Sequence, residues 1–429
     1  MQHVPGKDDS PHVATGRLPG YYRYVIEAIL FLTYGAFGMT WSAAGSFLKE
    51  IMEQLSLTLS QASFINTSVC MAKIVGPVAA GFILSRLGPR KAFLLASGLV
   101  CVGILSPFST GFGSLLLARF TMGLGGAMIV VYFTPIVMEW FAPGQRETVN
   151  GLNHVSISLG MMLGLLITRP LMEIMGGSWR RVLLIYSLIS MVLFVCWALL
   201  GKNSPHQEDS RQRPPEDVGD PRQDKALYKE MLRDPSTWKM IFTYSGFLSL
   251  YMVIMTYMPT YYRLRDIFTP ESPVHLAPPL AMFMGIPATL LGIHFARSTG
   301  LRVPTVRISG ILLIPGTLGL FLPESAGVIL ACAMITGVGM FLWRSAFFTI
   351  PQELPGSTPR RASYMMGIFW AASYTAGTIC TYLTGVIIES TGSYHLGFYF
   401  ITLISTTMFA GSFILPETGP GRLKTIKAW

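Results

Sequence analysis

Three basic side chains fall inside apolar stretches of the sequence. Lys73 and Arg119 lie near the centres of predicted spans, and Arg344 lies in the inner third of another. An unpaired cation at the centre of a bilayer costs at least about 2.5–3.5 kcal/mol. No aspartate occurs in these spans to neutralise the three charges, and the span glutamates lie toward helix ends. The pattern indicates either an anionic solute or pairing with backbone carbonyls and water. A structural role stays open for Arg119, and extension toward the cytoplasm stays open for Arg344.

Groups that can change charge at accessible pH form a second set of candidates. His154 and His294 are the histidines of the predicted spans, and Glu27 is the strongest carboxylate candidate for coupling transport to a proton. A structural role is the alternative for each of the three. Tyr34 and Tyr251 carry polar tips suited to line a solute pathway, although outer aromatic residues often form interfacial belts instead.

Enzyme motifs are missing from the sequence. It contains no G-x-S-x-G, no P-loop, no H-E-x-x-H and no CxxC. We therefore expect no catalytic residues, no enzyme and no cofactor. All five cysteines fall within predicted spans, where thiols are more often small apolar residues than metal ligands. The sequence leaves a metal site undetermined.

The elements that carry these residues are long apolar segments. The chain has 429 residues, of which 51% are hydrophobic and only 13% charged. Its mean hydropathy is +0.49. A span of about 20 apolar residues crosses a bilayer as a helix. A single helix makes all of its backbone hydrogen bonds internally, as the bilayer requires. We predict an all-α membrane protein with twelve transmembrane helices in two six-helix bundles. The predicted spans are 24–48, 61–85, 92–110, 113–140, 147–172, 182–200, 238–262, 276–296, 304–322, 326–350, 362–388 and 393–415.

A polar segment divides the spans into two sets of six. The predicted order is an N-terminal tail (1–23), a first bundle (24–200), a linker (201–236), a second bundle (237–415) and a C-terminal tail (416–429). The linker is too polar to fold alone, although 224–233 fits a short amphipathic helix at the membrane surface. A solvated linker is the favoured interpretation.

Charge predicts the orientation of the spans. Basic residues concentrate in the tails, the linker and alternate loops, whereas the opposite loops hold only Lys49, Arg180, Arg181, Arg263 and Arg265. The positive-inside rule then places both termini in the cytoplasm. The net charge of +10 is explained by these loops, so we expect no nucleic-acid partner.

Two loops half a chain apart are related in sequence. They are Gly81-Phe-Ile-Leu-Ser85-Arg86-Leu-Gly88-Pro-Arg90-Lys91 and Gly292-Ile-His-Phe-Ala296-Arg297-Ser-Thr-Gly300-Leu-Arg302. The first resembles the G-x-x-x-D-R-x-G-x-R-R/K signature of the major facilitator superfamily. Arg119 to Gly125 and Trp179 to Arg181 resemble further patterns of that family.

The resemblance implies a carrier that works by alternating access, with these loops as gates. In the family, the aspartate of the loop is thought to cap a neighbouring helix and to pair with arginine. Ser85 and Ala296 stand at that position here. Whatever holds the protein closed on one side is therefore expected to lie elsewhere.

The stretch from Gly20 to Glu50 is similar to MamH-type carriers of magnetosome membranes in magnetotactic bacteria. That resemblance implies iron transport for biomineralisation, in the bacterial inner membrane or the magnetosome membrane. Lys73 and Arg119 would repel a bare iron cation, so iron is expected to move as an anionic chelate.

Two alternatives stay open. The first is an organic-anion or monocarboxylate permease that uses the same basic residues. The second is a scaffold that no longer transports and recruits membrane-protein partners through 201–236. We expect a monomer in the lipid bilayer whose ligand is a small solute or an iron species. The direction of transport and the coupling ion are not predicted.

Overall fold

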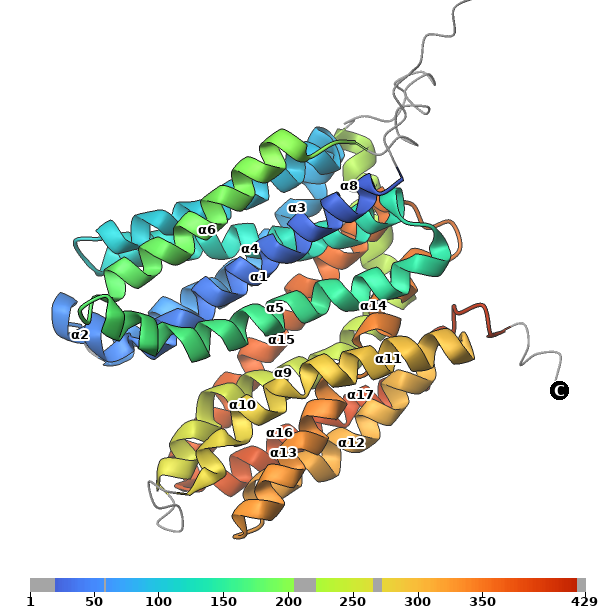
Figure 1. Ribbon diagram of the computed structural model, residues 1–429. Helices are drawn as coiled ribbons and strands as arrows, with labels where there is room; N and C mark the ends of the chain where they lie inside the picture. Colours follow the sequence, from blue (N-terminus) through green and yellow to red (C-terminus); the bar gives the residue numbers. More distant parts are fainter. Residues whose placement is uncertain (1–19, 58, 204–220, 265–271, 423–429) are drawn as a thin grey trace, which may run out of the picture.

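The computed structural model describes residues 20–57, 59–203, 221–264 and 272–422. Within these ranges the regular structure is entirely helical, and no residue lies in a strand. The helices form two bundles that lie side by side (Figure 1). This arrangement confirms the predicted all-α fold class. Predictions for 1–19, 204–220 and 423–429 fall outside the described residues.

The N-terminal bundle contains the first six predicted spans. Its helices are α1 (Tyr22–Ser46), α2 (Leu48–Leu55), α3 (Leu59–Cys101), η1 (Val102–Phe108), α4 (Phe112–Trp140), α5 (Pro143–Ile174) and α6 (Trp179–Leu200). α3 holds two predicted spans because the backbone turns at Gly88, where φ is 71° and ψ is 166°. Only glycine adopts this conformation readily, since a Cβ would clash with the backbone.

The C-terminal bundle contains the other six spans, and several of its helices are broken. Its elements are α9 (Pro235–Leu264), η2 (Pro273–Leu276), α10 (Ala277–Phe283), α11 (Gly285–Thr299), α12 (Val303–Phe321), α13 (Ala326–Phe341), α14 (Arg344–Glu353), α15 (Pro359–Thr391), α16 (Tyr394–Ser405) and α17 (Thr407–Gly411). The break between α13 and α14 leaves Arg344 as the first residue of a new helix.

Among the described residues, ten helical stretches are long and apolar enough to cross a membrane. One of them, Ser68–Phe108, covers two predicted spans. The last predicted span is divided between α16 and α17, which are both too short to be counted among the ten. The ten stretches, with one counted twice, and the α16–α17 pair therefore account for twelve crossings.

The bundles approach each other at one end and diverge at the other. In Figure 1 they diverge toward the end that carries α2 and α10. The start of α1 and helix α8 (Pro221–Arg233) lie at the opposite end. Across the contact, α5 packs on α11 and α14, while α15 packs on α3 and α4.

Glycines allow the closest approaches between helices. A Cβ placed on Gly160 of α5 would lie 2.0 Å from the carbonyl oxygen of Gly35 in α1. A Cβ on Gly292 of α11 would lie 1.9 Å from the carbonyl oxygen of Leu342. These positions are closed to any side chain, so the glycines serve helix packing, as is common in membrane bundles.

Candidate substrate site and interdomain contacts

Lys73 lies buried at the contact between the two bundles. Its Nζ donates a hydrogen bond of 3.1 Å to the hydroxyl of Tyr374 in α15. The same atom lies 3.7 Å from the ring centroid of Trp41 in α1. Within the described part of the chain the ammonium has no carboxylate partner. Aromatic faces therefore hold this cation, and they leave its charge without a counter-ion.

Arg344 is held in the same way from the other bundle. Its guanidinium lies 4.1 Å from the ring centroid of Phe341 and 5.7 Å from that of Phe247. It makes one long contact, 3.5 Å, to the carbonyl oxygen of His154. The side chains of Tyr34, Tyr244, Tyr251 and Tyr374 lie near it. Tyr374 thus belongs to the surroundings of both Lys73 and Arg344, so the two cations converge on one region.

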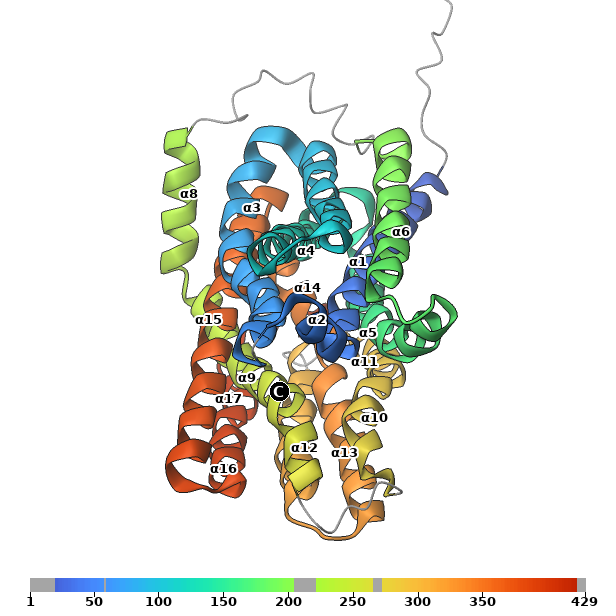
Figure 2. The ribbon, with the colours of Figure 1, turned by 90° about the vertical axis from the view of Figure 1, so that its left-hand side faces the viewer.

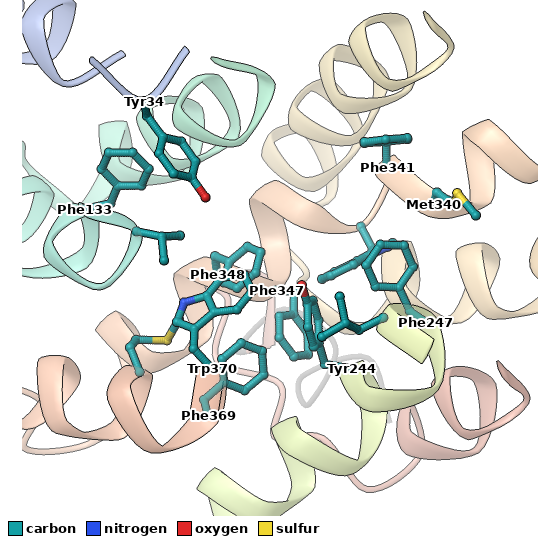
Figure 3. Close-up of a cluster of buried hydrophobic side chains, with 14 of the residues drawn as sticks. Tyr34, Phe133, Tyr244, Phe247, Met340, Phe341, Phe347, Phe348, Phe369 and Trp370 are labelled. Atoms are coloured by element: carbon teal, nitrogen blue, oxygen red, sulfur yellow. The ribbon is translucent and has the colours of Figure 1, made fainter. Parts of the chain in front are cut away.

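A stack of rings connects this region across the bundles. Tyr374 stacks on Trp370 with centroids 5.8 Å apart, and Trp370 stacks on Phe348 at 5.4 Å. Phe348 in turn stacks on His154 of α5 at 3.9 Å. Figure 3 shows Trp370 and Phe348 at the middle of the cluster, facing Tyr34. The indole Nε1 of Trp370 is buried and has no hydrogen-bond partner, which leaves a donor for a ligand.

Tyr34 and Tyr251 also join the cluster. Tyr34 packs between Phe37 and Phe133, with centroids 6.0 Å and 5.0 Å away. The hydroxyl of Tyr251 lies 3.9 Å from the sulfur of Met161 in the other bundle. Four predicted pathway residues, Lys73, Arg344, Tyr34 and Tyr251, are therefore brought together.

Sequence reasoning missed Trp41 and Phe348. For Trp41 a signal existed, because Tyr34, Phe37 and Trp41 recur at spacings that place them on one helical face. The same signal existed for Phe348, because Phe341, Arg344 and Phe348 have the same spacing.

Arg119 has a different environment from the other two cations. It is fully buried and donates to the carbonyl oxygens of Thr40 (2.9 Å) and Trp41 (3.0 Å) in α1. Backbone carbonyls neutralise part of its charge and tie α4 to α1. These contacts fit the structural interpretation of this arginine.

The three candidates for proton coupling lie in separate places. Glu27 is buried, and neither carboxylate oxygen has a hydrogen bond of ordinary geometry, although the side chain of Asn153 lies beside it. His154 is part of the aromatic stack. His294 is exposed on α11.

One interdomain network surrounds Ser85 of the first loop. The hydroxyl of Ser85 donates 2.9 Å to one carboxylate oxygen of Asp224 in α8. The other oxygen accepts from Arg360 (2.6 Å) and from the hydroxyl of Tyr364 (2.7 Å), both in α15. Burial raises the pKa of Asp224, but the hydrogen bonds from these three side chains outweigh it and hold the pKa below its usual value. Gly81, from the same loop, packs directly against the ring of Tyr364.

A second network surrounds the second loop. The guanidinium of Arg302 binds Glu147 of α5 and, at 2.7 Å, Glu353 of α14. Glu417 caps the start of α12 by accepting from the backbone N–H groups of Arg302 (2.8 Å) and Val303 (3.0 Å). Between the two networks, the side-chain amide of Asn150 donates to Thr349 at 3.2 Å, and its oxygen accepts from Gln352 at 3.1 Å.

The remaining loop residues shape the turns or lie at the surface. Gly300 ends α11 with φ at 66°, and its carbonyl accepts from the N–H of Gly421. Arg86, Arg90 and Arg297 are exposed. The contacts between bundles that are described above at these loops come from Gly81, Ser85 and Arg302.

Two bundles of long apolar helices define a class of protein, the multi-pass membrane proteins. Comparison with known proteins gives the family. Residues 30–364 match the family model described as Major Facilitator Superfamily. The chain belongs to this superfamily, whose members are secondary transporters rather than enzymes.

Relatives and solved structures agree with this assignment. The chain is 29% identical over 280 residues to an uncharacterised protein of Campylobacter jejuni, a match that covers 65% of this chain and 84% of that one. It is 23% identical to a probable sulfoacetate transporter of Cupriavidus necator (85% and 87% covered) and to a hexuronate transporter of Bacillus subtilis (81% and 84%). The fold is that of the proton:xylose symporter XylE (TM-score 0.72, 13% identity, 95% and 100% covered) and of FucP in the outward conformation (0.70, 13%, 92% and 99%).

Proposed function

We propose that this protein carries a small organic anion across a membrane by alternating access. The observation that carries the proposal is the convergence of Lys73 and Arg344 on one aromatic cluster, without a carboxylate partner in the described residues. An anion that enters between them would neutralise two buried charges at once. Its hydroxyl or carboxylate groups would find the tyrosine hydroxyls and the Trp370 donor within the cluster.

The names of several relatives support a sugar acid or a short sulfonate or carboxylate as cargo. They include a sulfoacetate transporter, a hexuronate transporter and a galacturonate transporter of Dickeya chrysanthemi. Galacturonate and other hexuronates carry one negative charge and sulfoacetate carries two, and all of them have a compact polar body. Stacked rings suit the flat face of a sugar acid, while Lys73 and Arg344 suit its acid group.

Ligand-induced stabilisation of the purified protein tests this proposal. A cargo that binds the folded state raises the melting temperature by mass action. We expect galacturonate or sulfoacetate, but not the uncharged sugar galactose, to stabilise the protein. We expect the shift to vanish in Lys73→Met and to persist in Arg169→Gln, which changes an exposed cation in α5. Equal stabilisation of Lys73→Met would contradict the assignment of Lys73.

We infer that Glu27 is the proton-coupling group, in preference to His154 or His294. A buried carboxyl without an ion pair is costly to ionise. The Asn153 side chain beside it could serve as a hydrogen-bond partner in one protonation state of Glu27 and not in the other. We expect Glu27→Gln to retain exchange of labelled for unlabelled cargo but to lose accumulation driven by a proton gradient. The matched control is His294→Gln, which should retain both. Normal accumulation by Glu27→Gln would remove Glu27 from the mechanism.

Iron in a magnetosome membrane is the second candidate cargo. The described residues contain no group of three His, Cys, Asp or Glu side chains that could hold a metal ion. Iron would therefore have to travel as an anionic chelate, held by the same Lys73 and Arg344. Ferric citrate belongs in the ligand panel for this reason. If no ligand binds and transport is absent, a scaffold acting through 201–236 becomes the better proposal.

We place the start of α1, helix α8 and residue 422 at the cytoplasmic face, following the distribution of basic loops. The proposed units are the two bundles 24–200 and 237–415, joined by the linker 201–236. The contacts of Asn150, Arg302 and Asp224 cluster at that face, so the protein would be closed to the cytoplasm in this conformation.

A further inference from the structure

A carboxylate from another part of the chain lies beside the loop position where the family pattern has aspartate. In the N-terminal bundle, Ser85 occupies the position where the family pattern has aspartate. Asp224 brings a carboxylate to within 2.9 Å of the Ser85 hydroxyl. Its side chain is only 1% exposed and receives hydrogen bonds from Arg360 and Tyr364 of α15. The carboxylate therefore pairs with arginine beside the start of a neighbouring helix, the role ascribed to the loop aspartate.

The packing of α8 fixes Asp224 in this position. Tyr228 packs against Phe82 and Tyr364, with ring centroids 5.5 Å and 6.3 Å away. Met231, on the same helical face as Asp224 and Tyr228, is buried. Figure 2 shows α8 at the edge of the molecule, next to the bundles. The helix is thus docked, whereas the sequence favoured a solvated linker.

α8 stays with the C-terminal bundle when the bundles separate. It ends at Arg233, and α9 begins two residues later at Pro235. The Thr237 hydroxyl donates 2.9 Å to the carbonyl of Met231, which stiffens this junction. Arg360 and Tyr364 also belong to the C-terminal bundle. The contacts that must break are therefore the bond from Ser85 to Asp224 and the packing of Phe82 on Tyr228.

We propose that Asp224 is a positioning residue of the transport cycle, which holds the two bundles closed at this end. The carboxylate lies on the linker helix α8, which is attached to the C-terminal bundle, instead of on the loop of the N-terminal bundle. The loop supplies the neutral donor, Ser85, in its place. The inference rests on alternating access but not on the identity of the cargo.

Exchange of the two side chains gives the sharpest test. Ser85→Asp alone places a second carboxylate at hydrogen-bond distance from Asp224, so repulsion should favour separation of the bundles. Asp224→Ser alone removes the acid and should act in the same direction. The double variant Ser85→Asp/Asp224→Ser returns the acid to the loop, within reach of Arg360 and Tyr364, and should restore closure.

Electron-spin distance measurements between Leu87 and Ser298 report the separation directly. Both residues are exposed, one on each bundle at this end. Each is replaced by a spin-labelled cysteine in full-length protein whose five native cysteines are replaced by alanine. We expect each single variant to raise the ratio of open to closed protein at least about tenfold, the effect of losing a charge-assisted hydrogen bond. The double variant should return to within about twofold of the parent.

The control lies on the same helix. Glu230 pairs with Arg361 at 2.7 Å, but its side chain is exposed, so Glu230→Gln should leave the ratio unchanged. If Asp224→Ser does not fold, Asp224→Asn replaces it and the same comparison holds. The proposal is overturned if the variants at 224 leave the distances unchanged, or if the double variant is no more closed than Ser85→Asp. Loss of cargo binding with the expected distances would count against the proposed cargo alone.

Discussion

Buried cations in this protein are held by two different kinds of partner. Lys73 and Arg344 contact aromatic rings, whereas Arg119 donates to the backbone carbonyls of Thr40 and Trp41. A ring face offsets only part of the cost of burying a charge. Carbonyl oxygens make charge-assisted hydrogen bonds and fix the geometry of two helices. The first arrangement leaves the cation available to a ligand, and the second does not.

The thermal stability of variants should therefore distinguish Arg119 from Lys73. Arg119→Met removes two hydrogen bonds that tie α4 to α1, and we expect it to destabilise the protein by about 2 kcal/mol or more. Lys73→Met replaces a buried charge by an apolar side chain of similar length, so the melting temperature should stay equal or rise. Thermal unfolding of both variants in detergent without ligand measures the difference. A larger loss for Lys73→Met than for Arg119→Met would show that Lys73 is structural.

At the scale of helices, span number and order were predictable because they follow from hydropathy alone. The break before Arg344 was not predictable, since no proline or glycine marks residues 342 and 343. Arg344 and Phe348 nevertheless keep the spacing from Phe341 that places the three side chains on one helical face. The docking of α8 was equally hidden, because Asp224 finds its partners 136 to 140 residues away in sequence. Local composition predicted the helix, but only the tertiary contacts show which face is buried.

The docked α8 should tolerate physiological changes of pH. The pKa of Asp224 in the folded protein lies below its unfolded value, which is about 3.9 for an ordinary aspartate. Its contribution is thus complete above that value and is lost only as the pH falls through the lower folded pKa. We expect the Leu87–Ser298 spin distances in unliganded protein to stay constant between about pH 5 and 8. Opening within that range would mean that another group controls this end.

At the scale of the whole molecule, three groups of polar contacts between the bundles gather at one end. Asn150, Arg302 and Asp224 link the bundles there, and the aromatic cluster with Lys73 and Arg344 lies deeper along the same contact. Separation of the bundles at this end must break buried polar contacts. Hydrogen bonds from water to the exposed groups offset part of that free-energy cost. Cargo that bridges Lys73 and Arg344 would draw the bundles together around the site. In the proposed cycle, these two sets of contacts would alternate.

Transport by the purified protein in liposomes tests the central claim most directly. Labelled galacturonate, sulfoacetate and ferric citrate are offered to vesicles that contain wild-type protein, Lys73→Met, Arg344→Met or Arg169→Gln. We predict saturable exchange of at least one organic anion by wild type and Arg169→Gln, and a loss of at least about tenfold in each of the other two variants. Exchange at wild-type rates in Lys73→Met and Arg344→Met would contradict the claim that these two cations form the anion site.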